Sequence, residues 1–98
     1  MNSYPVYKLE KDLELVLMNS NFTCALEVAR EDKVYRIVNP LTKGKVAIEL
    51  FDDLPDYMIM IYGGDSSVNR DLAAIVEEIV ITSGGRKVTG EELDEVLT

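Results

Sequence analysis

The sequence predicts an α+β fold, a two-layer sandwich in which helices cover a four-stranded antiparallel sheet. Apolar residues recur at helical spacing near the start of the chain and again in its last third. Between these parts the period changes to two, as in half-buried strands separated by short polar turns. The expected order is one helix, a four-stranded meander and two helices, in a single domain spanning residues 1–98.

The first helix is expected from about Tyr7 to Met18. Its apolar stripe consists of Leu9, Leu13, Val16 and Leu17. These positions are spaced i, i+4, i+7 and i+8 and therefore lie on one side of a helix. The turn-prone residues 19–21, Asn-Ser-Asn, follow and favour its end there.

Four segments with strand character follow the first helix. They span residues 24–29, 34–38, 46–51 and 57–62. Polar turns at 30–33 and 39–44 are short enough to make the neighbouring strands antiparallel. The single cysteine, Cys24, opens the first of these segments, where we expect it to be a small buried hydrophobe.

The fourth of these strands has apolar residues on both sides. Tyr57, Ile59 and Ile61 would point to one face of the sheet, and Met58, Met60 and Tyr62 to the other. A strand that is covered on only one side carries polar residues on its second side. We therefore expect both faces to be covered here, either by the terminal helices or by another subunit.

The second helix is predicted over residues 72–80 and the third from Gly90 to about Leu97. Asp65, Ser66 or Ser67 could cap the start of the second helix, and Gly84 favours its end. The β-branched residues 79–82 leave open a second interpretation, in which 79–88 forms a hairpin. For the third helix, Thr89 and Glu92 have the spacing of a capping box.

The charge of the protein is concentrated in its second half. Residues 1–50 contain seven acidic and seven basic side chains, whereas residues 51–98 contain eleven acidic side chains and three basic ones. The second half thus carries the whole formal net charge of −8. A charge of this sign opposes binding to nucleic acids and anionic membranes and favours a basic protein surface as partner.

The residue types present exclude several kinds of chemistry. Without histidine, the chain cannot form a Ser-His-Asp or Cys-His catalytic site. One cysteine and no histidine are too few of the usual ligands for a structural zinc site. The glycine-rich motifs that bind phosphates do not occur. We therefore expect no metal, no cofactor and no enzymatic activity. The sequence shows neither a signal peptide nor a membrane span, so a cytoplasmic location is expected.

These observations favour a small intracellular protein that binds a basic partner without catalysis, as an inhibitor, an antitoxin-like or immunity-like factor or a chaperone would. The candidate partner-binding residues are Asp52, Asp53, Asp56, Glu91, Glu92, Asp94 and Glu95. The alternative is an assembly subunit that forms a homo-oligomer, for example a homodimer, through strand 57–62 or helix 72–80. In that case the acidic residues would only keep the protein in solution.

Overall fold

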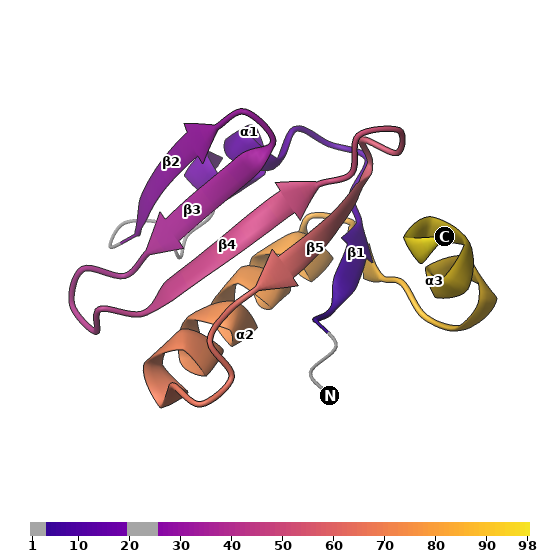
Figure 1. Ribbon diagram of the computed structural model, residues 1–98. Helices are drawn as coiled ribbons and strands as arrows, with labels where there is room; N and C mark the ends of the chain where they lie inside the picture. Colours follow the sequence, from indigo (N-terminus) through magenta and orange to yellow (C-terminus); the bar gives the residue numbers. More distant parts are fainter. Residues whose placement is uncertain (1–3, 20–25) are drawn as a thin grey trace.

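One antiparallel sheet of six strands, in the order β2-β3-β4-β5-β1-β6, forms the centre of the computed structural model (Figure 1). The structure describes residues 4–19 and 26–98. The strands are β1 (Val6–Lys8), β2 (Glu27–Glu31), β3 (Val34–Val38), β4 (Lys45–Leu50), β5 (Tyr57–Ile61) and β6 (Arg86–Lys87). The helices are α1 (Leu13–Asn19), α2 (Ser67–Thr82) and α3 (Gly90–Leu97). The α+β class predicted from the sequence is thus confirmed.

The predicted meander corresponds to β2, β3, β4 and β5, which pair consecutively along the chain. The first hairpin is tighter than expected, because β2 continues to Glu31 and only two residues form the turn. Asp32 in this turn has a φ of 56°, a left-handed conformation that aspartate tolerates better than most residues. Residues 24 and 25, including the expected buried Cys24, lie outside the described residues.

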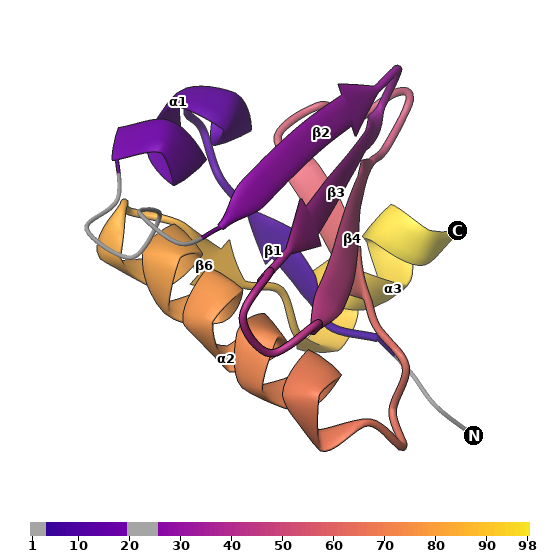
Figure 2. The same cartoon turned by 90° about the vertical axis from the view of Figure 1, so that its left-hand side faces the viewer.

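The main hydrophobic core lies between one face of the sheet and two helices. Tyr35, Ile37, Ile48, Met58 and Met60 point to this face and are at most 2% exposed. Helices α1 and α2 pack on them, and Figure 2 shows both helices on the same side of the sheet. The helix side chains in this core are Leu13, Leu17, Leu72, Ala73, Val76, Ile79 and Val80.

Helix α3 lies on the opposite face of the sheet, where a second and smaller core forms (Figure 2). Val96 of α3 is buried with Val6 and Val88, and Tyr57 and Ile59 pack against this group. The predicted two-layer arrangement is therefore incomplete, because the sheet has helices on both faces at this end. The second side of strand β5 is covered at Tyr57 and Ile59 by the chain's own third helix.

The expected first helix is wrong in its first part. Residues 6–8 form β1, which pairs with both β5 and β6, and α1 begins only at Leu13. Asp12 fixes this start, because its side chain accepts a hydrogen bond of 2.9 Å from the backbone N–H of Glu14. Leu9 is nevertheless buried, at 2% exposure, although it precedes the helix.

Helix α2 has the predicted cap and excludes the hairpin interpretation of residues 79–88. Ser66 is the N-cap and accepts a hydrogen bond of 3.3 Å from the backbone N–H of Asn69. The helix continues to Thr82, and Gly84 follows with a φ of 100°, as expected for a helix stop. The chain then forms the two-residue strand β6, which the sequence did not indicate. None of the helices in the described part of the chain combines the length and the apolar character that crossing a membrane requires.

Candidate functional site

The seven candidate residues come from two segments, the loop between β4 and β5 (residues 52–56) and the helix α3. The fold brings these segments side by side. Phe51 and Tyr57, which flank the loop, pack against the cluster that contains Val96 of α3. The apolar residues at both ends of the loop thus anchor it to the same small core that holds the helix.

Glu92 differs from the other candidates because its carboxylate is held within the protein. Arg86 donates to both of its oxygens, at 2.5 Å from Nη1 to Oε1 and 2.7 Å from Nη2 to Oε2. The Tyr57 hydroxyl also donates to Oε2, at 2.7 Å. Together these donors, Arg86 first, lower the pKa of Glu92 to about 2.

This network explains why the predicted capping box does not form. Thr89 occupies the N-cap position of α3 with an extended backbone, φ −141° and ψ 169°, but its side chain makes no capping hydrogen bond. Glu92 is the second half of the expected box, and it faces Arg86 and Tyr57 instead. Its function is to attach α3 to the sheet rather than to cap the helix.

Asp52 is the second candidate with an internal partner, because it forms an ion pair with Lys33. This hydrogen bond raises the pKa of Lys33 above its ordinary value. The other five candidates are exposed, and none of them forms an ion pair within residues 4–19 and 26–98. We call these five residues the acidic end: Asp53, Asp56, Glu91, Asp94 and Glu95.

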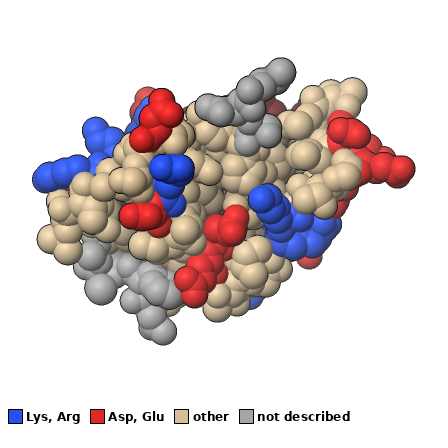
Figure 3. Space-filling model, turned by 90° about the horizontal axis from the view of Figure 1, so that it is seen from below, with Lys and Arg blue, Asp and Glu red and all other residues tan. Residues whose placement is uncertain are grey.

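Basic side chains do not neutralise the acidic end. Arg86 and Lys33, which come from its surroundings, are already paired with Glu92 and Asp52. Figure 3 shows acidic side chains at the end of the molecule where α3 lies, with basic ones beside them, and further acidic side chains near the middle and at the other end. The acidic end therefore presents five exposed carboxylates that form no ion pair in the described part of the chain.

The acidic end does not have the arrangement of a metal site. Among the residues that the structure describes, no group of three or more histidine, cysteine, aspartate or glutamate side chains could hold a metal ion. The exposed carboxylates can instead accept hydrogen bonds from lysine and arginine side chains of a partner.

Comparison with protein-family models, curated proteins and solved structures gives no significant match to this chain. The role of the site therefore has to be inferred from its own geometry. Sequence reasoning missed Tyr57 and Arg86 as the residues that fix α3. One signal was available, since Arg86 is one of only three basic residues in the acidic half of the chain.

Proposed function

We propose that this protein is a non-enzymatic binding module that uses its acidic end to engage a basic surface of another protein. The observation that carries the proposal is the position of the loop 52–56 beside α3, through the packing of Phe51 and Tyr57 near Val96. Two groups of carboxylates that are far apart in the sequence are thereby attached to one small core, which supports a shared binding surface. Together they contain five exposed carboxylates without an ion pair in the described part of the chain.

The physical basis is long-range attraction followed by short contacts. An exposed ion pair contributes little by itself, about 0–1 kcal/mol, but a group of like charges creates a field that accelerates the approach of an oppositely charged protein. The molecule's formal net charge of −8 strengthens this field. We expect the association rate to decrease with added salt, because exposed charges are screened over about 10 Å at 0.1 M.

The attachment of α3 supports the same function. The helix is fixed by the buried Val96 and by the hydrogen bonds from Arg86 and Tyr57 to Glu92. A binding surface that is already ordered loses less conformational entropy when the partner binds. Because Glu92 holds the helix, Glu91, Asp94 and Glu95 remain available on its exposed side.

The assembly-subunit alternative depends on surfaces that the fold already uses. Met58 and Met60 of strand β5 are buried under the helices, and Leu72 and Val76 of α2 are in the same core. A homo-oligomer formed through these segments would have to use their partly buried residues, such as Ile61 of β5 and Ile75 of α2. Size-exclusion chromatography with light scattering distinguishes the two functions, because the binding module is expected to be a monomer when its partner is absent.

The acidic end can be tested with two variants of equal charge. The first carries amide substitutions at the acidic end, Asp53→Asn, Asp56→Asn, Glu91→Gln, Asp94→Asn and Glu95→Gln. The second neutralises five other exposed carboxylates: Glu27→Gln, Glu31→Gln, Asp65→Asn, Asp71→Asn and Glu78→Gln. Both variants and the wild type are immobilised and used to capture proteins from native lysate, and association rates of a captured partner are measured by stopped flow at two salt concentrations.

We expect the first variant to lose capture and the second to retain it. The association rate of the wild type should fall at high salt, and that of the first variant should be low at both concentrations. Equal capture by both variants, or rates that do not respond to salt, would contradict the proposal. Both variants should retain the wild-type free energy of unfolding within about 1 kcal/mol, because all substituted positions are exposed.

A further inference from the structure

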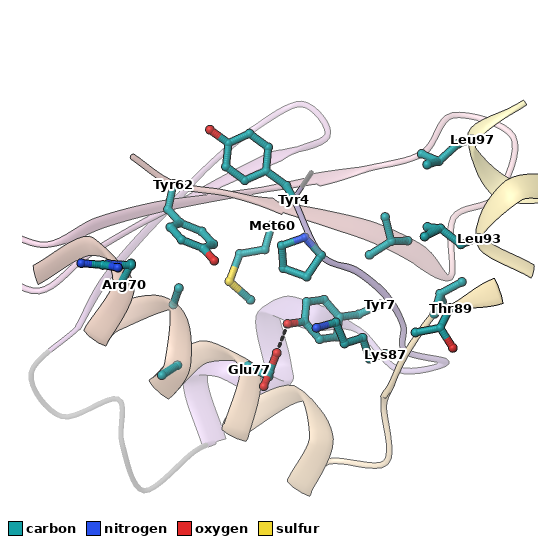
Figure 4. A pocket seen from close by; sticks show the side chains of 15 residues that line it. Tyr4, Tyr7, Met60, Tyr62, Arg70, Glu77, Lys87, Thr89, Leu93 and Leu97 are labelled. Carbon is teal, nitrogen blue, oxygen red and sulfur yellow. Dashed lines mark hydrogen bonds between the residues drawn. The ribbon is translucent and has the colours of Figure 1, made fainter. Parts of the chain in front are cut away.

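A groove runs along the β1 side of the sheet, between α2 and α3, and it does not include any residue of the acidic end. Its volume is about 440 Å³, within the size range of small-molecule sites in proteins, about 300–1,000 Å³. Residues Tyr4 to Tyr7 of the chain form its floor together with Met60 and Tyr62 (Figure 4). Ala73 and Ala74 line it from α2, and their small side chains leave space above the floor.

The groove contains two of the three basic residues of the acidic half of the chain. Arg86, the third, is paired with Glu92, whereas Arg70 and Lys87 line the groove. Neither of these two forms an ion pair with a carboxylate in the described part of the chain. In a half with eleven acidic side chains, two unpaired cations beside one groove are an unexpected local excess of positive charge.

One carboxylate, that of Glu77, faces the same groove. The hydroxyl of Tyr7 donates to its Oε2 atom, and Figure 4 shows this bond beside Lys87, with Arg70 further along the groove. Tyr7 is 1% exposed, so its buried ring holds the position of the carboxylate. A carboxylate can accept about four hydrogen bonds, and the bond from Tyr7 therefore leaves Glu77 able to accept others.

The rest of the groove is apolar or aromatic. The rings of Tyr4 and Tyr62 meet edge to face, with centroids 5.7 Å apart, above Met60. Leu93 and Leu97 of α3 close the other end (Figure 4), where Leu97 is 57% exposed. An apolar or aromatic side chain of a ligand would cover these residues and gain the free energy of removing apolar surface from water.

From these features we propose that the groove binds a small zwitterion, a molecule with an ammonium group, a carboxylate and an apolar or aromatic side chain. An amino acid and a dipeptide share this chemistry. The ammonium group donates to Glu77, and the carboxylate binds the neighbouring Lys87, with Arg70 adding positive charge further along the groove. The side chain lies against Met60 and the aromatic floor.

The presence of both charge types decides between this ligand and simpler ones. A plain anion would bind Arg70 and Lys87 but would be repelled by Glu77, which lies in the same groove. A plain cation would be attracted by Glu77 but repelled by Arg70 and Lys87, which line the same groove. A ligand with both charges can pair Glu77 and a basic side chain of the groove at the same time, and charged hydrogen bonds of this kind carry selectivity.

The test uses three matched probes and a dipeptide. L-Phenylalanine has both charges, phenethylamine lacks the carboxylate, 3-phenylpropionate lacks the ammonium group, and glycyl-phenylalanine places the two charges further apart. Each is titrated at millimolar concentration into the ¹⁵N-labelled full-length protein, and the amide shifts are followed by NMR. We expect shifts at Tyr4, Ala74 and Lys87, and an affinity for L-phenylalanine or the dipeptide about tenfold above those for the two singly charged probes.

Two substitutions in α2 make the test specific. Glu77→Gln keeps an oxygen that can accept the Tyr7 hydroxyl and removes the charge, so it should weaken L-phenylalanine about tenfold and leave 3-phenylpropionate no weaker than before. Glu78→Gln is the matched control, because Glu78 is the adjacent exposed residue and does not line the groove. It should bind all four probes as the wild type does.

Several results would overturn the proposal. These are the absence of saturable shifts with both zwitterions, equal affinity for L-phenylalanine and 3-phenylpropionate, and equal effects of Glu77→Gln and Glu78→Gln. If the zwitterions bind as expected, the tighter of the two identifies the source of the ligand as a free amino acid or a short peptide.

Discussion

Glu92 shows how a single carboxylate can hold an element in place. Arg86 and Tyr57 both donate to it, and they come from β6 and β5, so the three residues connect α3 to two strands. The pKa of Glu92 falls from its ordinary 4.5 to about 2 because these donors stabilise the ionised form. Its contribution to stability is therefore fully present above about pH 4.5 and is lost as the pH falls toward about 2.

We predict that Glu92→Gln removes this part of the acid sensitivity. The amide cannot be protonated in this range, so the difference in free energy of unfolding between wild type and variant should shrink as the pH falls from about 4.5 toward about 2. Chemical denaturation of both proteins at a series of pH values measures this difference. Glu91→Gln is the control, since Glu91 is exposed on the same turn of α3. A constant difference over this pH range would contradict the network.

Gly85 is a residue whose missing side chain is required by the packing. A Cβ atom at this position would lie 2.6 Å from Cγ1 of Val80 and 2.9 Å from the Val80 carbonyl oxygen. Since Val80 is completely buried, the contact cannot be relieved without moving the end of α2. We predict that Gly85→Ala costs about 1–3 kcal/mol of unfolding free energy, as overpacked substitutions do.

Gly63→Ala provides the comparison for Gly85. Its Cβ would meet only the side-chain nitrogen of Asn69, at 3.1 Å, and a side chain can adjust more easily than backbone. We expect a smaller loss of unfolding free energy than for Gly85→Ala, and urea denaturation measures both variants. Equal losses at both positions would show that the close approach of Gly85 to Val80 is not what limits substitution.

At the scale of elements, periodicity predicted those segments that are long enough to show a period. The strands β3, β4 and β5 and the helix α3 were found within one residue at each end, and α2, expected over residues 72–80, extends further at both ends. Strands β1 and β6 have three and two residues, which is too short to distinguish one period from another. They form because β1 pairs with β5 and β6, which are about fifty and eighty residues away in the chain, and local sequence contains no record of such pairing.

The two helix caps give a prediction at this scale. Ser66 accepts a hydrogen bond from the backbone of Asn69, whereas Thr89 makes no side-chain hydrogen bond at the start of α3. Ser66→Ala should therefore cost about 1 kcal/mol of unfolding free energy, the usual effect of losing a cap. Thr89→Ala should cost less than about 0.5 kcal/mol. A loss of about 1 kcal/mol for Thr89→Ala, with reduced amide protection in α3, would show instead that Thr89 caps the helix as the sequence predicts.

At the scale of the whole molecule, the candidate site depends on contacts that no local pattern contains. The acidity of the loop 52–56 and of α3 is visible in the sequence, but their attachment to one core around Val6, Val88 and Val96 is not. The groove is a further example, because Lys87 of β6 lines it together with Arg70 and Glu77 of α2 only after β1 has paired with β6. The types of residue at each site could be predicted from the sequence. Which of these residues lie together in the folded molecule could not.

The second core should behave as a unit separate from the first. Val96 is the buried residue of α3, and the main core contains no side chain from that helix. Val96→Asp would place a charge in an apolar cluster at a cost of about 2 kcal/mol or more, which exceeds what a short helix can offset. We predict that the substitution detaches α3, so that hydrogen exchange accelerates in residues 90–97 while the amides of α2 remain protected.

Detachment of α3 should also change how the molecule associates. It uncovers Val6, Tyr57 and Ile59 on the sheet and disperses the acidic end, so Val96→Asp should self-associate and lose capture of a basic partner. Hydrogen exchange followed by mass spectrometry and light scattering measure the two effects. Leu97→Asp is the control, because it adds the same charge to the same helix at a side chain that is 57% exposed. If both variants keep α3 protected and monomeric, the second core does not hold the helix. The acidic surface would then not depend on the packing of Val96.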